Sequence, residues 1–420
     1  MADLYIIGQY NGTASTTAVS ICSQIMHMIT VMIVGLAMGT TVLIGQAVGA
    51  KKSKDISTVI GNTITLYMGI AVVLMVVVLM CINPIVNIMS TPIEAIEGTK
   101  LYLTICFIGI PFITAYNLIS SIFRGLGDSK SPMYFIAIAC VANIIFDYVF
   151  IGYFHLDTAG AALGTTLAQT LSVIISLFMI MKRKMIHLSL SDLKIRKDTV
   201  KDLFSIGIPV ACQDGFIQDG FIQVSFLVIT IIANRRGLDV AAAVGIVEKM
   251  ITFMFLVPSS MLSSVSALAA QNVGANEHQR ASQTLRYACT IAFSWGLLMV
   301  IVMYFFSYPL IGMFSDSESV VTLGCQYMSG YVWDCVFAGI HFSFSGYFCA
   351  YNASLISFIH YSLSIICFRI PLAYLSAIYF PSTLLPMGLA SSTGSLFSIF
   401  FCICVFIYMK RKGKLSGQVV

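Results

Sequence analysis

The stretch MKRKMIHLSLSDLKIRKDTVK occupies residues 181–201, near the middle of a chain of 420 residues. It is the one long polar and basic run in a sequence that is otherwise strongly apolar. Long hydrophobic segments, broken by short connectors, lie on both sides of it. We interpret residues 182–201 as a solvated loop that divides the chain into two halves, residues 1–181 and 202–420.

The composition indicates a membrane protein. Hydrophobic residues make up 58% of the chain and charged residues only 10%, whereas soluble domains are about a quarter charged. Apolar runs of about 20 residues recur, each long enough to cross a hydrocarbon core as a helix. The ten-residue alternation of a membrane β-barrel is not seen. The predicted fold class is therefore an all-α polytopic membrane protein.

The apolar segments give a count of spans. An apolar stub at residues 1–8 is too short to cross a bilayer. Full-length segments follow at residues 18–45, 57–81, 97–122, 132–152, 159–181, 203–234, 240–269, 283–306, 320–349, 355–379 and 385–409. The sequence thus predicts a stub and eleven spans.

Basic residues set the predicted orientation. Most of the 23 lysines and arginines fall in alternate connectors, which the positive-inside rule places in the cytoplasm. These connectors lie near residues 51–54, 124–130, 182–201, 280–286 and 410–414. We therefore expect a multi-pass protein of the bacterial cytoplasmic membrane with a cytoplasmic C-terminus.

An internal repeat relates the two halves. GQAVGAKK (residues 45–52) matches AQNVGANE (residues 270–277) at an offset of 225. Weaker matches share this offset at residues 123–131 with 348–356, and at residues 143–148 with 368–373. Because each repeat has an even number of spans, both halves start on the same side of the membrane and have the same orientation. The repeat therefore predicts two pseudo-symmetric lobes of six helices each, related as parallel repeats.

The repeat exposes two anomalies. Residues 199–225 have no partner in the first half, so most of a first helix is expected to be missing ahead of residue 1. DGFIQ occurs twice in succession, at residues 214–218 and 219–223. Five extra helical residues rotate the rest of the helix by about 140°. We interpret the copy as a duplication that lengthens the cytoplasmic end of its helix.

No enzyme motif is present. The six histidines are isolated, the twelve cysteines are scattered through apolar segments, and no phosphate-binding loop or catalytic signature occurs. The sequence therefore predicts neither an enzyme nor a cofactor. Because no loop for binding a nucleoside triphosphate is present, any transport against a concentration gradient would have to be driven by an ion gradient.

Four polar residues share one predicted depth in the first half. Asn143 and Asp147 lie on one helix face. Asp3 and Thr165 fall at a similar distance from the outer boundary, roughly 8–10 Å at 1.5 Å per residue. Because two nearby carboxylates repel each other when both are ionised, they favour binding a proton or a cation. Oxygen ligands suit H⁺ or a hard ion such as Na⁺.

One alternative to a cation site remains open for this group. Each residue could instead be a separate polar residue in helix packing. The repeat offset places Val228, Phe368, Leu372 and Ala390 at the equivalent positions of the second lobe. None of these is a carboxylate, so a cation site would belong to the first lobe only.

The second lobe carries other charged residues within its apolar segments. Asp334 and Arg369 fall near the middles of their spans, which predicts an ion pair between neighbouring helices. Such a pair is at least as well explained by packing as by a substrate contact. Glu248 is a third candidate for a polar or substrate contact.

Several stretches together resemble the multidrug and toxic compound extrusion (MATE) family. They are MADLYIIGQ, GTTVLIGQAVGAK, FRGLGDSKSP, NIIFDYVFI, GAALGTTLAQ and VPSSMLSSVSALAAQNVGA. The resemblance implies two six-helix lobes and export of amphipathic, often cationic compounds in exchange for H⁺ or Na⁺. In DinF-like members it implies a coupling cluster that corresponds here to Asp3, Asn143, Asp147 and Thr165.

The functional hypothesis is a monomeric, cation-coupled antiporter that works by alternating access. Its partners would be a small amphipathic substrate and the lipid bilayer, with no role for nucleic acid. A flippase for lipid-linked oligosaccharides is an alternative, although Arg369 is nearly alone where several basic residues would be expected. A defective copy that does not transport is the other alternative.

Overall fold

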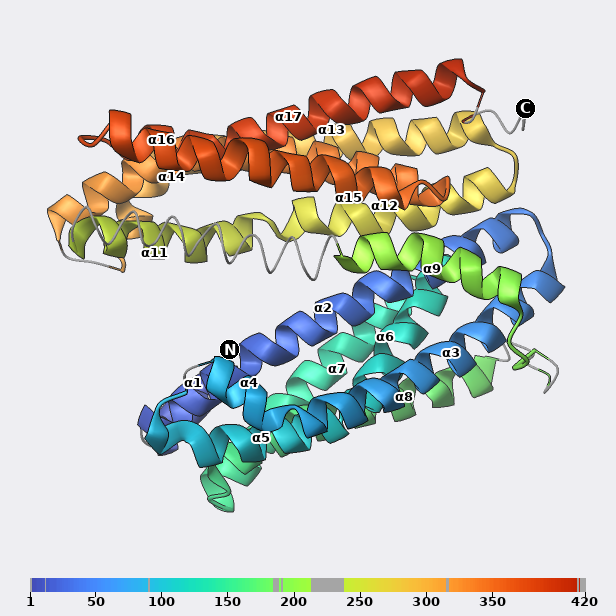
Figure 1. The fold of residues 1–420 in the computed structure, drawn as a ribbon, viewed down its shortest axis with the longest axis horizontal. Helices are drawn as coiled ribbons and strands as arrows, with labels where there is room; N and C mark the ends of the chain where they lie inside the picture. Colours follow the sequence, from blue (N-terminus) through green and yellow to red (C-terminus); the bar gives the residue numbers. More distant parts are fainter. Residues whose placement is uncertain are drawn as a thin grey trace. The chain divides into compact units, whose positions relative to one another are not determined.

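The computed structural model describes residues 2–11, 13–89, 91–183, 189, 192–212, 238–314, 317–413 and 415. Throughout these residues the regular structure is helical, as predicted (Figure 1). The chain divides into two compact units. The first unit comprises residues 1–48 and 52–207, and the second comprises residues 49–51 and 208–420.

The first unit contains α1 to α8 and the first part of α9, whose residues 208–211 belong to the second unit. Their bounds are α1 Ala2–Tyr10, α2 Thr13–Gly49, α3 Ser53–Met80, α4 Ile82–Ile88, α5 Ile96–Ile108, α6 Ile110–Gly125, α7 Lys130–Asp147, α8 Asp157–Arg183 and α9 Lys197–Ala211. A 3₁₀ turn, Ile93–Ala95, precedes α5. α8 packs against α5, α6 and α7, and α1 packs against α7 and α8. These contacts bring α1 beside the polar segment of α7.

The second unit is arranged around α14 (Glu318–Ala350). α14 packs against α11 (Leu238–Met254), α12 (Leu256–Gly274), α13 (His278–Gly312) and α17 (Leu385–Arg411). Gly330 of α14 faces Gly388 of α17, and a Cβ on either would overlap the partner backbone. Small residues let membrane helices approach closely. The apolar segments of this unit therefore form one packed bundle.

Many helices keep a wide apolar face exposed. On α3 the exposed side chains form one stripe: Val72, Val73, Val76, Val77 and Met80. Among the described residues, eight helices are long and apolar enough to span a membrane, or nine if one bent pair counts as a span. The all-helical membrane fold is thus confirmed at this level. The count of eleven spans and the lobe symmetry stay predictions.

One predicted span is sharply bent in the part of the chain that the structure describes. The sequence predicts a single helix at residues 97–122, whereas the structure has α5 and α6 bent by 47° at Gly109. Pro111 lies in the first turn of α6, where its missing N–H costs no hydrogen bond. The apolar run continues through the break, so hydropathy alone does not locate it.

π-Helical segments, which the sequence did not predict, lie in two of the spans that the structure describes in full. One, Tyr148–Tyr153, directly follows α7. The other, Ser364–Arg369, joins α15 (Ser354–Leu363) to α16 (Ile370–Tyr379). Such wider turns often mark functional positions in helices. Here the first begins just after Asp147 and the second ends at Arg369.

The motif FRGLGDSKS has a structural role at the start of α7. Both carboxylate oxygens of Asp128 are used there. Oδ1 accepts hydrogen bonds from the backbone N–H groups of Lys130 and Ser131, at 3.1 and 3.0 Å. Oδ2 accepts one from the Ser131 hydroxyl at 2.6 Å. Asp128 therefore satisfies donors at the N-terminus of the helix that carries Asn143 and Asp147.

The described part of the central loop is held against α3. The buried Asn62 amide donates to the carbonyl oxygen of Asp192 at 3.3 Å and accepts from the N–H of Arg196 at 2.5 Å. Thr65 donates to Leu193 O at 3.0 Å. The predicted start of the second half at residue 202 falls inside α9. Both DGFIQ copies, residues 214–223, lie outside the described residues.

Candidate functional site

Asp147 is the central residue of the first unit's polar cluster. It is the last residue of α7 and its side chain is fully buried. Gly164 of α8 lies directly against it, and a Cβ at that position would overlap Oδ1. Because only glycine leaves this space, α8 can pack close to the carboxylate.

The structure brings together the four residues that the sequence singled out. The Asn143 amide nitrogen lies 3.4 Å from Asp147 Oδ1 and 3.5 Å from Thr165 Oγ1. Thr165 Oγ1 in turn lies 3.5 Å from Asp3 Oδ2. The contacts form one continuous chain from α1 through α8 to α7. The role of these residues in coupling stays a prediction.

A cavity of about 150 Å³ adjoins the chain of contacts. It is lined by residues of α1, α6, α7 and α8: Asp3, Tyr116, Ile136, Ala139, Cys140, Asn143, Thr165, Ala168 and Gln169. The Tyr116 hydroxyl and the Gln169 Oε1 are buried and have no hydrogen-bond partner among the described residues. The polar residues Tyr116 and Gln169 therefore line the cavity together with Asp3, Asn143 and Thr165 of the predicted four.

Tyr116 and Gln169 were missed by the sequence analysis. Tyr116 lies in an apolar run and looks like a packing aromatic, and Gln169 is uncharged. Gln169 is four residues after Thr165 and thus on the same face of α8. That spacing was the one signal that could have found it.

The cluster offers oxygen atoms to a small cation. Asp147 Oδ2 is buried and accepts no hydrogen bond from the described residues. The contacts along the chain, at 3.4–3.5 Å, are longer than optimal hydrogen bonds. Within the described residues, no three His, Cys, Asp or Glu side chains group as a metal site. The arrangement fits a proton or a hard monovalent cation held by two carboxylates with neutral oxygens.

A second polar group lies in the second unit. Arg369 donates a hydrogen bond from Nη2 to the Tyr331 hydroxyl at 2.6 Å, and its guanidinium lies 5.6 Å from the centre of the Tyr331 ring. The sequence did not indicate Tyr331 as a partner. Asp334 is buried, and its Oδ1 accepts no hydrogen bond from the described residues. The ion pair between Asp334 and Arg369 stays a prediction, to which the structure adds Tyr331.

Glu248 belongs to the same surroundings. It lies on α11, is half-buried, and its Oε1 has no hydrogen-bond partner among the described residues. Glu248 and Asp334 both interact electrostatically with Arg369. Arg369 is thus the basic residue nearest in its electrostatic effect to both candidates, while a direct ion pair with either stays a prediction.

The sequence matches a known family over most of its length. The family model described as MatE matches residues 1–149 and 217–375. The chain belongs to the MatE family. The matched ranges include Asp3, Asn143 and Asp147 of the first cluster and all three candidates of the second unit, while Thr165 lies between them.

Two curated relatives illustrate the family's range. This MatE protein is 26% identical over 349 residues to "Probable multidrug resistance protein YoeA" of Bacillus subtilis, covering 81% of this chain and 74% of the relative. It is 24% identical over 353 residues to "Multidrug export protein MepA" of Staphylococcus aureus, covering 82% and 75%. One name is that of a probable multidrug resistance protein and the other that of a multidrug export protein, and neither names a catalytic activity.

Solved structures share the fold. A structure described as MATE in the straight conformation has a TM-score of 0.88 at 18% identity, covering 98% of this chain and 92% of that one. The MATE transporter VcmN of Vibrio cholerae gives 0.89 at 20% identity, covering 99% and 93%. At these identities the likeness establishes the membrane-protein fold of this MatE protein.

Proposed function

We propose that this MatE protein is a cation-coupled antiporter that exports amphipathic, often cationic compounds by alternating access. The observation that carries the proposal is the chain of contacts from Asp3 through Thr165 and Asn143 to Asp147. Asp3, Asn143 and Thr165 of this chain of contacts line a cavity that is large enough for part of a small molecule.

The charge state of this cluster can control which conformation is stable. A buried carboxylate with an oxygen that accepts no hydrogen bond, such as Oδ2 of Asp147 among the described residues, is unfavourable when ionised, so binding H⁺ or Na⁺ stabilises the packed arrangement of α1, α7 and α8. Release of the ion favours a state in which the carboxylates are better solvated. An ion that binds one state more tightly shifts the equilibrium by that difference in affinity.

The second lobe lacks a matching arrangement at the equivalent positions. At the repeat offset, Asn143 corresponds to Phe368, whose ring stacks on Phe397 with centroids 4.3 Å apart. Asp147 corresponds to Leu372 and Thr165 to Ala390. This asymmetry supports a coupling site that belongs to the first lobe.

The substrate class follows from two features. The relatives carry names of multidrug resistance and multidrug export proteins. In the first unit, the cavity beside Asp3 offers a negative charge together with amide, hydroxyl and apolar surface. An amphipathic cation would find complementary groups there. We further propose a cytoplasmic C-terminus and a monomer.

Gradient-driven transport tests this function. Everted vesicles containing the protein are given either a pH gradient alone or a Na⁺ gradient alone, and uptake of the fluorescent cation ethidium is recorded. We expect uptake with one of these gradients and its collapse when that gradient is dissipated. Uptake equal to that of vesicles without the protein under both gradients would contradict the proposal.

A further inference from the structure

The chain makes a turn directly after α17. This helix ends at Arg411, and Gly413 has a φ of 70°. Glycine adopts this left-handed conformation without strain, and helices commonly end at such a residue. Its N–H donates a hydrogen bond to Lys410 O at 3.2 Å. Two residues later Leu415 is buried, whereas Lys410 and Arg411 are exposed. The end of the described chain is therefore anchored at Leu415.

Tyr351, at the end of α14, holds this segment. Its hydroxyl donates a hydrogen bond to the carbonyl oxygen of Leu415 at 3.4 Å. The same hydroxyl lies 3.0 Å from Nδ1 of His278, the first residue of α13. Because a tyrosine hydroxyl has one proton and a carbonyl oxygen can only accept, Nδ1 of His278 is the donor to Tyr351. One hydroxyl thus joins α13, α14 and the residues after α17.

Tyr347 makes a similar contact one helical turn earlier. It lies on the same face of α14 as Tyr351, and the two ring centres are 5.0 Å apart. Its hydroxyl lies 3.2 Å from Ser282 Oγ, four residues after His278 on α13. Its ring centre is 5.7 Å from that of Phe406 on α17. Tyr347 therefore joins the same three helices, but through residues within them rather than through the segment after α17.

Tyr351 also lies at the turn between α14 and α15. α14 ends one residue before Tyr351, and the next residue, Asn352, has a left-handed φ of 56°. α15 begins two residues after Asn352 and leads into the π-helical segment that ends at Arg369. A restraint on Tyr351 therefore acts on the connection to the span that carries Arg369.

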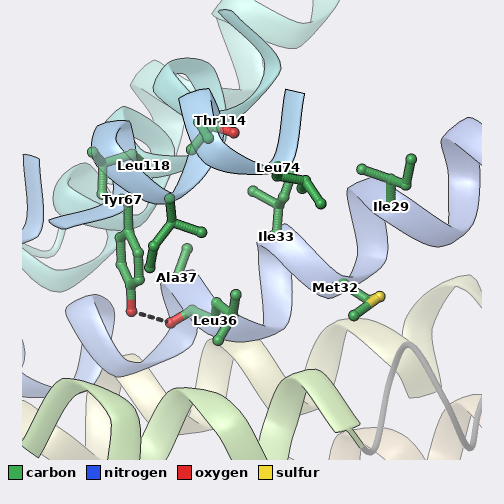
Figure 2. Close-up of a pocket in the computed structure, with 11 residues that line it drawn as sticks. Ile29, Met32, Ile33, Leu36, Ala37, Tyr67, Leu74, Thr114 and Leu118 are labelled. Carbon is green, nitrogen blue, oxygen red and sulfur yellow. Dashed lines mark hydrogen bonds between the residues drawn. The ribbon is translucent and has the colours of Figure 1, made fainter. Parts of the chain in front are cut away.

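The contact between Tyr351 and Leu415 is long for a hydrogen bond. Inside the first unit, the Tyr67 hydroxyl donates to the carbonyl oxygen of Leu36 at 2.7 Å, which is near the optimum (Figure 2). The 3.4 Å between Tyr351 and Leu415 indicates a weaker bond. Of the described residues beyond α17, only Leu415 is buried. Segments with so few buried contacts open at little cost in free energy.

We propose that Leu415 and Tyr351 form a latch, which holds the turn between α14 and α15 against α13 and slows the rearrangement of these helices. A contact that one conformation makes and another lacks stabilises the first by the value of that contact. The latch is therefore an inhibitory contact that the chain makes with itself. Its effect on transport rests on the proposed function, whereas its effect on the turn does not.

Cleavage by trypsin after Lys412 or Lys414 reports opening of the latch, because the protease needs an extended segment and Leu415 must first leave Tyr351. The full chain in lipid nanodiscs is digested, and mass spectrometry follows the released peptides. Tyr351→Phe should speed this cleavage about threefold, the value of a weak hydrogen bond. The matched control, Tyr347→Phe, should change it less than about 1.5-fold. Cleavage after Lys194 in the central loop is the internal reference.

Hydrogen exchange tests the restraint on the turn. Leu415→Ser leaves α13 and α14 untouched and exposes the segment, so cleavage after Lys412 or Lys414 should be about tenfold faster. Exchange of the peptide spanning residues 350–356 should rise by up to the same factor, while a peptide spanning residues 130–136 of α7 stays unchanged. Gradient-driven ethidium transport by Leu415→Ser should be at least about twofold faster. If Tyr351→Phe fails to fold, Leu415→Ser decides.

Three results would overturn the latch. They are the same cleavage rate in Leu415→Ser and the unchanged protein, equal effects of Tyr351→Phe and Tyr347→Phe on cleavage, and unchanged exchange of residues 350–356 despite faster cleavage. Faster exchange of the turn with an unchanged transport rate would overturn its inhibitory role. Absence of transport by the unchanged protein would refute the proposed function, and the exchange result would still decide the latch.

Discussion

Oδ1 of Asp147 occupies the space that a side chain on Gly164 would need. α7 and α8 are thereby fitted to each other at the one fully buried carboxylate of the four-residue cluster. The neighbouring Thr165 continues the contact toward Asp3. Adding one methyl group at Gly164 should therefore displace residues of the cluster.

Gly164→Ala should reduce gradient-driven ethidium transport about tenfold, because overpacking typically costs about 1–3 kcal/mol. The added methyl displaces Asp147 and separates it from Asn143. The matched control is Gly69→Ala on α3, where an added Cβ meets nothing within 4 Å. Rates are measured in vesicles at equal protein content. Equal transport by the two variants would contradict the close fit.

Tyr331→Phe should destabilise the second unit. Its hydroxyl accepts the 2.6 Å hydrogen bond from Arg369, and a hydrogen bond to a charged group contributes about 1.5–3 kcal/mol. Tyr374→Phe is the control, since Tyr374 is exposed on α16. Thermal denaturation in detergent measures both. If the two variants unfold at the same temperature, the hydrogen bond does not contribute as proposed.

Asn62→Ala should release the described end of the central loop from α3. Asn62 bonds to both Asp192 and Arg196, and the exposed backbone of the loop has few other anchors in the described residues. Limited trypsin digestion followed by mass spectrometry should show faster cleavage after Arg196. Asn272→Ala is the control, because that amide bonds within its own helix, to Leu268 O. Unchanged cleavage in Asn62→Ala would rule out this anchoring.

The turn at Asp192 should be insensitive to pH near neutrality. The backbone N–H and then the hydroxyl of Ser189 donate to the carboxylate, at 3.0 and 2.7 Å, and lower the pKa of Asp192. Because the pKa of Asp192 in the folded state is lower than the value of about 3.9 in the unfolded state, the ionised carboxylate stabilises the turn at pH values above about 3.9. This stabilisation is lost only as the pH falls below that value and through the folded-state pKa. Hydrogen exchange of the peptide spanning residues 189–196, corrected for intrinsic rates, should match at about pH 5 and 7.5. Lower protection at the more acidic value would contradict this.

Sequence reasoning found the first-lobe cluster because helix geometry converts residue number into depth. Asp3, Asn143, Asp147 and Thr165 fall at one level from their helix ends, and the structure brings them into one chain of contacts. Equal depth in the membrane does not show which of the helices carrying these residues are neighbours. The contact required the tertiary fold.

Other features left no readable signal. The bend at Gly109 lies inside a continuous apolar run, and π-helical turns have no composition of their own. Tyr331 reaches Arg369 because of its side-chain direction, which one sequence does not specify. The same limit hid Tyr116 and the contact of Tyr351 with Leu415.

The central claim is that Asp147 couples an ion gradient to export. Asp147→Asn keeps the size of the side chain and removes its charge, and Asp202→Asn changes an exposed carboxylate on α9 as a control. Ethidium uptake into everted vesicles is measured under the gradient that drives the unchanged protein. The proposed coupling predicts that Asp147→Asn abolishes gradient-driven uptake while ethidium binding and the Asp202→Asn rate stay normal. Uptake by Asp147→Asn at the unchanged rate would contradict it.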